Sequence, residues 1–181
     1  MINQLDFYQN ARQISSPFCN QRPAGSEISL LVIHCISLPE GCYGGREIES
    51  LFTGCLDCHT HPDFSALKGL EVSAHCVIRR AGEIEQYVPF EKRAWHAGVS
   101  CFAGVDRCND YSIGIELEGT DKSAYTEKQY RSLATLTQKI QQHYPAISKQ
   151  RIVAHSEIAP GRKTDPGSGF DWVYYLSLLS D

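Results

Sequence analysis

The apolar residues of the chain first mark three short stretches as strands of a sheet. Residues 29–34 form a continuous apolar run that ends on a histidine, which is typical of a buried central strand. Residues 112–118 alternate instead, so Glu116 lies on the face opposite to the aliphatic side chains of this stretch. Residues 151–154 form a short run with β-branched side chains that places His155 at a strand end, before a polar loop with proline and glycine.

Further patterns predict a hairpin and two helices. Residues 75–80 and 84–88 are expected to pair as a hairpin, because a short turn with glycine lies between them. A capping-box pattern begins at Thr126, and apolar residues recur at helical spacing from there until Pro145 ends the helix. A final amphipathic helix is expected to begin near Asp171.

The remaining segments are rich in turn residues. Residues 1–27 are expected to be irregular, and residues 37–69 to form a long loop around a short helix at 46–52. The chain contains no internal repeat and no low-complexity segment. Strands interleaved with helices therefore predict a mixed sheet with helices packed on it, in a single domain over residues 1–181.

Composition limits the classes of partner. The chain has 181 residues, of which 42% are hydrophobic, enough for one ordinary globular core. The 17 Lys and Arg residues against 21 Asp and Glu residues give a net charge of −4, which argues against nucleic acid or an anionic membrane as the main partner. The first residues lack the basic and apolar regions of an export signal, and no apolar run approaches the roughly 20 residues of a membrane span. We therefore expect a cytoplasmic protein.

Cysteines are numerous, and one group of them matches a known pattern. Because the chain is larger than a disulfide-rich mini-protein and shows no export signal, we expect its eight cysteines to be free thiols. Cys55-Leu-Asp-Cys58-His59 fits the pattern of c-type haem attachment, and the same residues with His61 could hold a structural zinc ion. Such haem attachment belongs to exported proteins, and the zinc site would lack a second close pair. We therefore expect an incidental Cys-rich loop and no haem.

Three side chains near the predicted strand ends suit a catalytic metal. His34 and His155 each end an apolar run, and Asp165 lies in the loop after the second, so the three converge if the two strands are neighbours. Two imidazoles and a carboxylate suit Zn²⁺ and leave one coordination position open, as in catalytic sites. That arrangement implies hydrolysis of an amide or an ester. Each residue taken alone also has an ordinary interpretation as a core or surface side chain.

Charged and thiol groups near these ligands have candidate roles. Glu116 could take a proton from an attacking water and pass it to the leaving amine, with Glu118 on the same strand face as the rival carboxylate. Lys163, in the loop of Asp165, could stabilise a developing oxyanion. A cysteine hydrolase with Cys35 or Cys76 beside a histidine is an alternative, although adjacency in sequence does not supply the geometry that such a pair needs.

Several blocks of the sequence resemble one family. They are Val72-Ser-Ala-His75-Cys-Val-Ile-Arg79-Arg80, Arg93-Ala-Trp95-His96-Ala-Gly98, Arg107-Cys-Asn109-Asp110, Ser112-Ile-Gly-Ile-Glu116-Leu-Glu-Gly119 and Arg162-Lys163-Thr-Asp165-Pro166-Gly167. From about Leu30 to Trp172 the chain is similar to the zinc-dependent N-acetylmuramoyl-L-alanine amidases, the amidase and peptidoglycan-recognition family. The resemblance implies an α+β fold with a central mixed sheet flanked by helices. It also implies hydrolysis of the amide bond between the lactyl group of (1,6-anhydro-)N-acetylmuramic acid and L-alanine, in peptidoglycan turnover and recycling.

The resemblance also implies a cofactor, a substrate and roles for single residues. The cofactor is Zn²⁺, and the substrate is a small molecule, a soluble anhydro-muropeptide. The implied residues are the zinc ligands His34, His155 and Asp165, the general base Glu116, the cation Lys163 beside the scissile carbonyl, and the muropeptide contacts His75, Trp95 and Arg107.

Some positions leave the substrate open. The family usually has Asn where this chain has Cys35, and a basic residue is common where it has Glu71, so selectivity for the anhydro sugar is not fixed by the resemblance. His96 could stack with Trp95 against a sugar ring. A non-catalytic muropeptide-binding module of the same fold is a further alternative, against which the intact set of three metal ligands argues.

Overall fold

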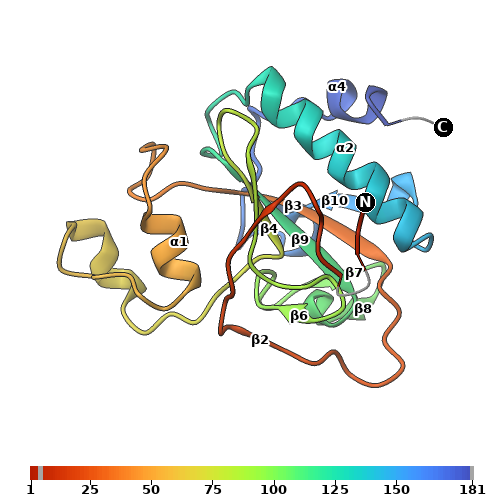
Figure 1. The fold of residues 1–181 in the computed structure, drawn as a ribbon, viewed down its shortest axis with the longest axis horizontal. Helices are drawn as coiled ribbons and strands as arrows, with labels where there is room; N and C mark the ends of the chain where they lie inside the picture. The colour runs from red at the N-terminus through yellow and green to blue at the C-terminus, as the bar shows by residue number, and fades with distance from the viewer. Residues whose placement is uncertain (4–5, 180–181) are drawn as a thin grey trace.

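A computed structural model describes residues 1–3 and 6–179, and its central element is a six-stranded mixed sheet (Figure 1). The strand order is β1 (Arg12–Gln13), β5 (Ile84–Gln86), β4 (Cys76–Ile78), β9 (Ser112–Glu118), β3 (Leu30–Ile36) and β10 (Ile152–Ala154). The two longest strands, β9 and β3, are parallel neighbours in the middle of the sheet, whereas β4 and β5 form the antiparallel hairpin. The predicted mixed sheet and hairpin are therefore confirmed.

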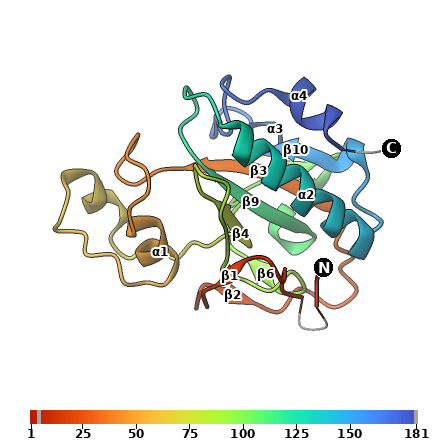
Figure 2. The same cartoon turned by 45° about the horizontal axis from the view of Figure 1, so that its top comes forward.

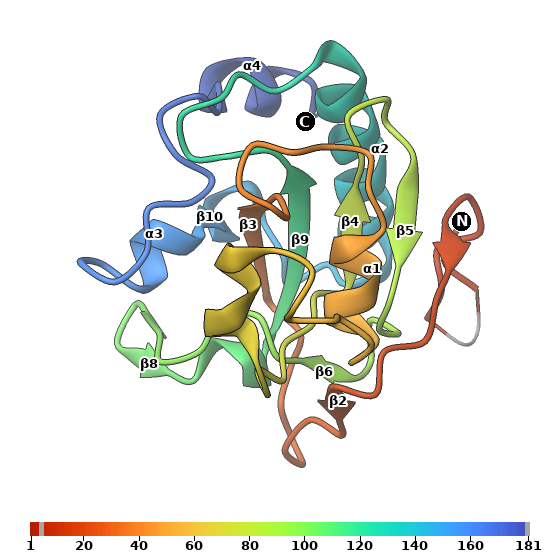
Figure 3. The same ribbon diagram turned by 90° about the vertical axis from the view of Figure 1, so that its left-hand side faces the viewer.

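Helices cover both faces of this sheet, which confirms the α+β class. One face carries α2 (Glu127–His143), with α4 (Trp172–Ser177) beside it (Figure 2). The other carries α1 (Glu47–Phe52) and η1 (Pro62–Leu67), so that Figure 3 shows α1 in front of the strands and α2 behind them. The remaining short elements are β2 (Cys19–Asn20) paired with β6 (Arg93–Ala94), β7 (Cys101–Phe102) paired with β8 (Val105–Asp106), η2 (Cys108–Asp110), η3 (Lys149–Arg151) and α3 (His155–Ile158). Within residues 1–3 and 6–179, no helix is long and apolar enough to cross a membrane.

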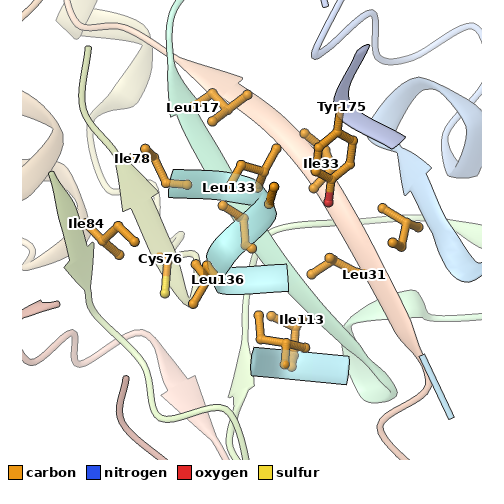
Figure 4. Close-up of a cluster of buried hydrophobic side chains, with 14 of the residues drawn as sticks. Leu31, Ile33, Cys76, Ile78, Ile84, Ile113, Leu117, Leu133, Leu136 and Tyr175 are labelled. Atoms are coloured by element: carbon orange, nitrogen blue, oxygen red, sulfur yellow. The ribbon is translucent and has the colours of Figure 1, made fainter. Parts of the chain in front are cut away.

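The largest hydrophobic core lies between the sheet and α2 (Figure 4). The side chains that β3 and β9 turn toward this helix are Leu31, Ile33, Ile113, Ile115 and Leu117. Leu133 and Leu136 of α2 pack among them, and each fully buried aliphatic side chain contributes about 1.5 to 3 kcal/mol. Because side chains alternate along a strand, the residues between these positions, which include His34 and Glu116, face the opposite side of the sheet.

Local signals placed the helix ends correctly. The Thr126 hydroxyl accepts from the backbone N–H of Gln129 at 3.1 Å, and the Gln129 side chain accepts from the Thr126 N–H at 3.1 Å, which confirms the predicted capping box. The helix ends at His143, shortly before Pro145. Asp171 caps α4 by accepting from the backbone N–H of Tyr174 at 2.8 Å, so the predicted final helix is also confirmed.

Two predictions need correction. His155 does not enter a loop directly but is the first residue of α3, because the Glu157 carboxylate accepts from the Ala154 N–H at 2.8 Å and starts a helical turn there. Residues 1–27 are not wholly irregular, since β1 and β2 lie within them. Their partners, β5 and β6, are distant in sequence, so no local pattern announces these pairings.

Arg22 ties this N-terminal segment to the rest of the fold. Its guanidinium donates to the backbone carbonyl groups of Phe90 (3.0 Å), Glu91 (3.0 Å), Asn109 (3.0 Å) and Ser112 (2.9 Å). No carboxylate shares in these contacts, and burial lowers the pKa of Arg22 to about 10. Peptide carbonyl groups of residues 90–91, 109 and 112 thus solvate the cation, which holds these parts of the chain together.

Candidate functional site

The register of the central strands brings the candidate residues together. His34 on β3 lies directly opposite Glu116 on β9, and because the strands are parallel neighbours both side chains point to the same face. On the other side of β3, Ala154 pairs with Ile33, so His155 follows one position later, beside His34. The sheet therefore sets one line of three polar side chains across its middle.

Two of these side chains, His34 and His155, also meet the carboxylate of Asp165. The His34 Nδ1 atom lies 2.9 Å from His155 Nδ1 and 3.1 Å from Asp165 Oδ2, and the His155 Nδ1 atom lies 3.0 Å from the same oxygen. One or two protons could not satisfy all three contacts, because the carboxylate only accepts and the two imidazole nitrogens face each other. Ligand atoms around one tetrahedral ion with bonds of about 2.0 to 2.1 Å lie roughly 3.3 Å apart. The cluster therefore has the dimensions of a metal site.

The ionisation of these groups also suits a metal. Burial lowers the pKa of His34 to about 4. Burial acts against ionisation of Asp165, but hydrogen bonds from His155 and His34 outweigh it and hold the pKa of the carboxyl well below its ordinary value. A neutral imidazole and an ionised carboxylate are the forms that bind metal ions. Within the described part of the chain, this trio is the one group of three or more His, Cys, Asp or Glu side chains whose ligand atoms share such a space.

Two carboxylates on β9 were rivals for a proton-transfer role, and their surroundings differ. Glu118 accepts from Arg79 (3.0 Å) and from the backbone N–H groups of Gly44 (2.7 Å) and Arg80 (3.1 Å). Glu116 is also buried, but within residues 1–3 and 6–179 its Oε2 atom has no hydrogen-bond partner. Burial, and then the charge of Asp165, raise the pKa of Glu116 well above 4.5. Of the two carboxyls, Glu116 is thus the one with an unpaired oxygen and a perturbed pKa, which makes it the candidate for the proton-transfer role.

Lys163 lies on the solvent side of this cluster. It is exposed and lines a cavity of about 430 Å³ together with Asp165 and Cys35. Burial is the main cause of the pKa shifts of His34 and Glu116, but the charge of Lys163 also disfavours the protonated form of both, so Lys163 lies within electrostatic reach of each. A ligand in this cavity would lie between the metal cluster and a cation.

The predicted substrate contacts divide into two groups. Trp95 and Arg107 line a smaller cavity of about 220 Å³, and the Arg107 side chain is 71% exposed. His75 is fully buried: its Nδ1 atom accepts from the Gly114 N–H at 3.0 Å, and its Nε2 atom lies 3.0 Å from the carbonyl oxygen of Lys92. Its ring is therefore not exposed in this structure, and the muropeptide contact that the resemblance implies for His75 stays a prediction.

His96 also lies elsewhere than expected. It does not stack with Trp95 toward solvent; its ring meets the edge of His34, with ring centres 5.0 Å apart. Burial, and then the charges of neighbouring histidines, hold the pKa of His96 well below 6.5. Burial likewise lowers the pKa of His75 to about 3. We refer to His34, His75 and His96 as the low-pKa histidines.

Thiol chemistry finds little support. Burial raises the pKa of Cys35 to about 12 and also raises that of Cys76, which packs in the core beneath α2, so neither forms a thiolate readily. All eight cysteines are free. Cys55 is exposed, and neither it nor Cys58 belongs to a group of potential metal ligands in the described residues.

Comparison with known proteins gives the family. The family described as N-acetylmuramoyl-L-alanine amidase matches residues 24–168. The 1,6-anhydro-N-acetylmuramyl-L-alanine amidase AmpD of Citrobacter freundii is 55% identical over 170 residues, which are 94% of this chain and 90% of that protein.

Solved structures agree. A crystal structure of a selenomethionine derivative of AmpD superposes with a TM-score of 0.96 at 53% identity, covering 99% of this chain and 100% of that one. Escherichia coli AmiD, solved with the substrate anhydro-N-acetylmuramic acid-L-Ala-D-γ-Glu-L-Lys, gives 0.62 at 30% identity over 90% of this chain and 62% of that one. The chain therefore belongs to the N-acetylmuramoyl-L-alanine amidase family.

Proposed function

We propose that the chain is a zinc-dependent hydrolase of the amide bond between the lactyl group of 1,6-anhydro-N-acetylmuramic acid and L-alanine in soluble muropeptides. The observation that carries the proposal is the convergence of His34, His155 and Asp165, with ligand atoms 2.9 to 3.1 Å apart, beside a buried carboxyl whose Oε2 atom has no hydrogen-bond partner in the described part of the chain. The names of its full-length relatives, which are 1,6-anhydro-N-acetylmuramyl-L-alanine amidases, supply the substrate class.

The donor set favours zinc among common metals. Two imidazole nitrogens and one carboxylate oxygen leave a fourth tetrahedral position open, which is the arrangement of catalytic rather than structural zinc sites. When bound there, Zn²⁺ would lower the pKa of a water to about 7 and polarise a carbonyl group. Burial favours the neutral imidazole of His34, and hydrogen bonds from the histidines keep the Asp165 carboxylate ionised, so both groups are in the form that binds the ion near neutral pH.

Glu116 would move the proton. Its Oε2 atom has no hydrogen-bond partner among the described residues and could accept a proton from the attacking water, then donate it to the departing amine of L-alanine. A raised pKa favours this double role, because the carboxyl then holds the proton long enough to pass it on. Lys163 would stabilise the negative charge that grows on the carbonyl oxygen, a contribution worth about 3 kcal/mol when the donor is pre-positioned.

Substrate recognition would use the cavities next to this centre. Arg107 is exposed and could pair with a carboxylate of the stem peptide, and Trp95 lines the same cavity. A protein of this class located in the cytoplasm would meet soluble turnover fragments rather than intact wall. We therefore expect fast release of peptide from anhydro-muropeptides and slow action on cross-linked wall.

Metal content of single variants tests the centre. Ala at His34, His155 or Asp165 should each remove zinc and activity, while His59→Ala, an exposed histidine of the α1–η1 segment, serves as the matched control and should keep both. Urea unfolding checks that each variant still folds. Near-stoichiometric zinc in all three ligand variants would contradict the proposed centre.

The sugar needs its own measurement. The kcat/KM values for anhydro-muramoyl and reducing muramoyl tripeptides should differ in favour of the anhydro sugar. A clear preference for the reducing sugar or for polymeric wall would contradict the substrate even if the metal chemistry holds.

A further inference from the structure

The Nε2 atoms of the two imidazole ligands point away from the metal cluster, and their hydrogen-bond partners limit the tautomer that each ring can adopt. Both His34 and His155 turn Nδ1 toward the cluster, so each must hold its proton on Nε2 if the Nδ1 lone pair is to bind a metal. For His155 the tautomer is fixed: Nε2 lies 3.2 Å from the carbonyl oxygen of Ala97, which can only accept.

The partner of His34 is different, because it can act in either sense. The His34 Nε2 atom lies 2.9 Å from His96 Nδ1, and the other nitrogen of His96 lies 3.1 Å from the Ser112 hydroxyl. A proton on His34 Nε2 requires His96 to accept at Nδ1 and to donate from Nε2 to Ser112. The reversed chain would place the proton of His34 on Nδ1, where it blocks metal binding. The direction of this chain therefore decides whether His34 can act as a ligand.

The fold holds both outer partners on one short piece of backbone. His96 and Ala97 are consecutive, and the Asn109 side-chain oxygen accepts from both of their N–H groups, at 3.2 and 2.8 Å. The His96 ring also lies flat against the backbone of β9: a Cβ atom at Gly114 would lie 2.5 Å from its Cγ and Nδ1 atoms. The absence of a side chain at Gly114 is thus what lets the ring approach His34.

We propose that His96, oriented by Asn109 and by Gly114, is a positioning residue that fixes the metal-binding tautomer of His34 through a directed chain ending at Ser112. This inference rests on the proposed zinc function. It gives His96 a role toward the metal rather than toward a sugar, and in it the hydroxyl of the buried residue Ser112 accepts the proton that His96 holds on Nε2.

Two substitutions of His96 that resemble each other in shape separate the effect of the hydrogen bond from the effect of side-chain shape. His96→Asn places a carbonyl oxygen near the former Nδ1 position, where it can accept from His34, whereas His96→Leu has the same branching and no acceptor. Zinc affinity, measured by competition with a chromophoric chelator, should fall roughly 10- to 100-fold for the Leu variant, the range for loss of an outer hydrogen bond to a metal ligand, and stay within about threefold of wild type for the Asn variant.

A spectroscopic measurement reads the tautomer directly. In the zinc-loaded wild type and Asn variant, the Nε2 proton of His34 should give a far-downfield proton resonance, since it is hydrogen-bonded; in the Leu variant it should move upfield. A purely structural role for His96 would lower the stability of the metal-free protein without separating the two variants in this way.

Ser112→Ala keeps the test open if the Leu variant does not fold. It removes one oxygen and with it the acceptor that holds the His96 proton on Nε2, so zinc affinity should fall about three- to tenfold. If wild type itself binds no zinc at this centre, the proposed function fails. If wild type binds zinc but all His96 and Ser112 variants match it, or if the Asn and Leu variants lose affinity equally, the positioning role of His96 is wrong while the proposed function stands.

Discussion

Exchanging Glu116 for glutamine should separate catalysis from folding, and exchanging Glu118 should do the reverse. Both carboxyls lie on one face of β9, two positions apart, and both are buried. Glu118 accepts hydrogen bonds from Arg79 and from two backbone N–H groups, whereas one oxygen of Glu116 accepts none. Each substitution keeps the size of the side chain and removes its charge, so the pair is a matched comparison.

For Glu116, the ionised carboxylate destabilises the folded protein because the side chain is buried. Because burial raises its pKa above 4.5, the folded metal-free protein retains a proton that the unfolded chain releases, and stability from this group falls as pH rises above 4.5. Each pH unit between there and pH 7 is worth about 1.4 kcal/mol, which limits the penalty to about 3 kcal/mol. Glu116→Gln should therefore raise the free energy of unfolding by about 1 to 3 kcal/mol, while turnover falls roughly 10²- to 10⁴-fold.

For Glu118 the balance is opposite. Hydrogen bonds to a charged group contribute about 1.5 to 3 kcal/mol each. The side-chain NH2 group of a glutamine at this position would face at least one of the N–H donors that now bind the Glu118 carboxylate, so that hydrogen bond would be lost. Glu118→Gln should lower the free energy of unfolding by about 2 to 4 kcal/mol and leave turnover within about fivefold of wild type.

Urea unfolding of chelator-treated protein at pH 7 and peptide release by zinc-loaded protein measure the two quantities. Loss of turnover in Glu118→Gln with full turnover in Glu116→Gln would mean that the wrong carboxyl has been chosen. A Glu116→Gln variant that is less stable than wild type would refute the argument that the buried charge opposes folding.

The other predictions concern pH, substrate charge and the cysteine loop. Metal-free protein should lose stability as pH falls from 6.5 toward 4, because the low-pKa histidines are neutral when folded and protonated when unfolded. Between about pH 5 and 6 Glu116 opposes them by one proton, so pH-dependent urea unfolding should there show a slope near two protons, about 3 kcal/mol per pH unit; a flat profile would contradict this. Arg107→Ala should raise KM more than it lowers kcat in steady-state kinetics, since a remote charge contact acts equally in ground and transition states, and a fall in kcat alone would count against it. A Cys55 and Cys58 double Ser variant should bind as much zinc per chain as wild type, whereas a drop from two ions to one would reveal a structural site.

The fold was predictable where its signals are local. The alternation of residues 112–118 and the capping box at Thr126 depend on neighbours in sequence, and both elements form where they were expected. The pairing of His34 with His155 was conditional on two strands being adjacent, and only the sheet order β9–β3–β10 supplies that. A single sequence contains the ligand types but not the register that joins them.

The surroundings of the buried site residues could not be predicted either, because they also depend on contacts between segments that are distant in sequence. Glu116 and Glu118 share a strand face, so no pattern along β9 distinguishes them; what distinguishes their surroundings is Arg79, which donates to Glu118 from another segment of the chain. His75 and His96 stand in blocks that resemble family motifs, yet burial gives one no access to solvent and places the other against His34. Such differences arise from three-dimensional packing, which residue types do not encode locally.

Arg22 bears on how far the folded unit of this chain extends ahead of the matched region. The family match starts at residue 24, two positions after Arg22, so a chain trimmed to the matched region would lose the cation around which four peptide carbonyl groups converge. One of these carbonyl groups belongs to Asn109, whose side chain holds the His96–Ala97 backbone. The stretch ahead of the matched region is therefore part of the structure that supports the candidate site, and grafting residues 24–168 alone would transfer the candidate site residues without the cation that organises the backbone beneath them.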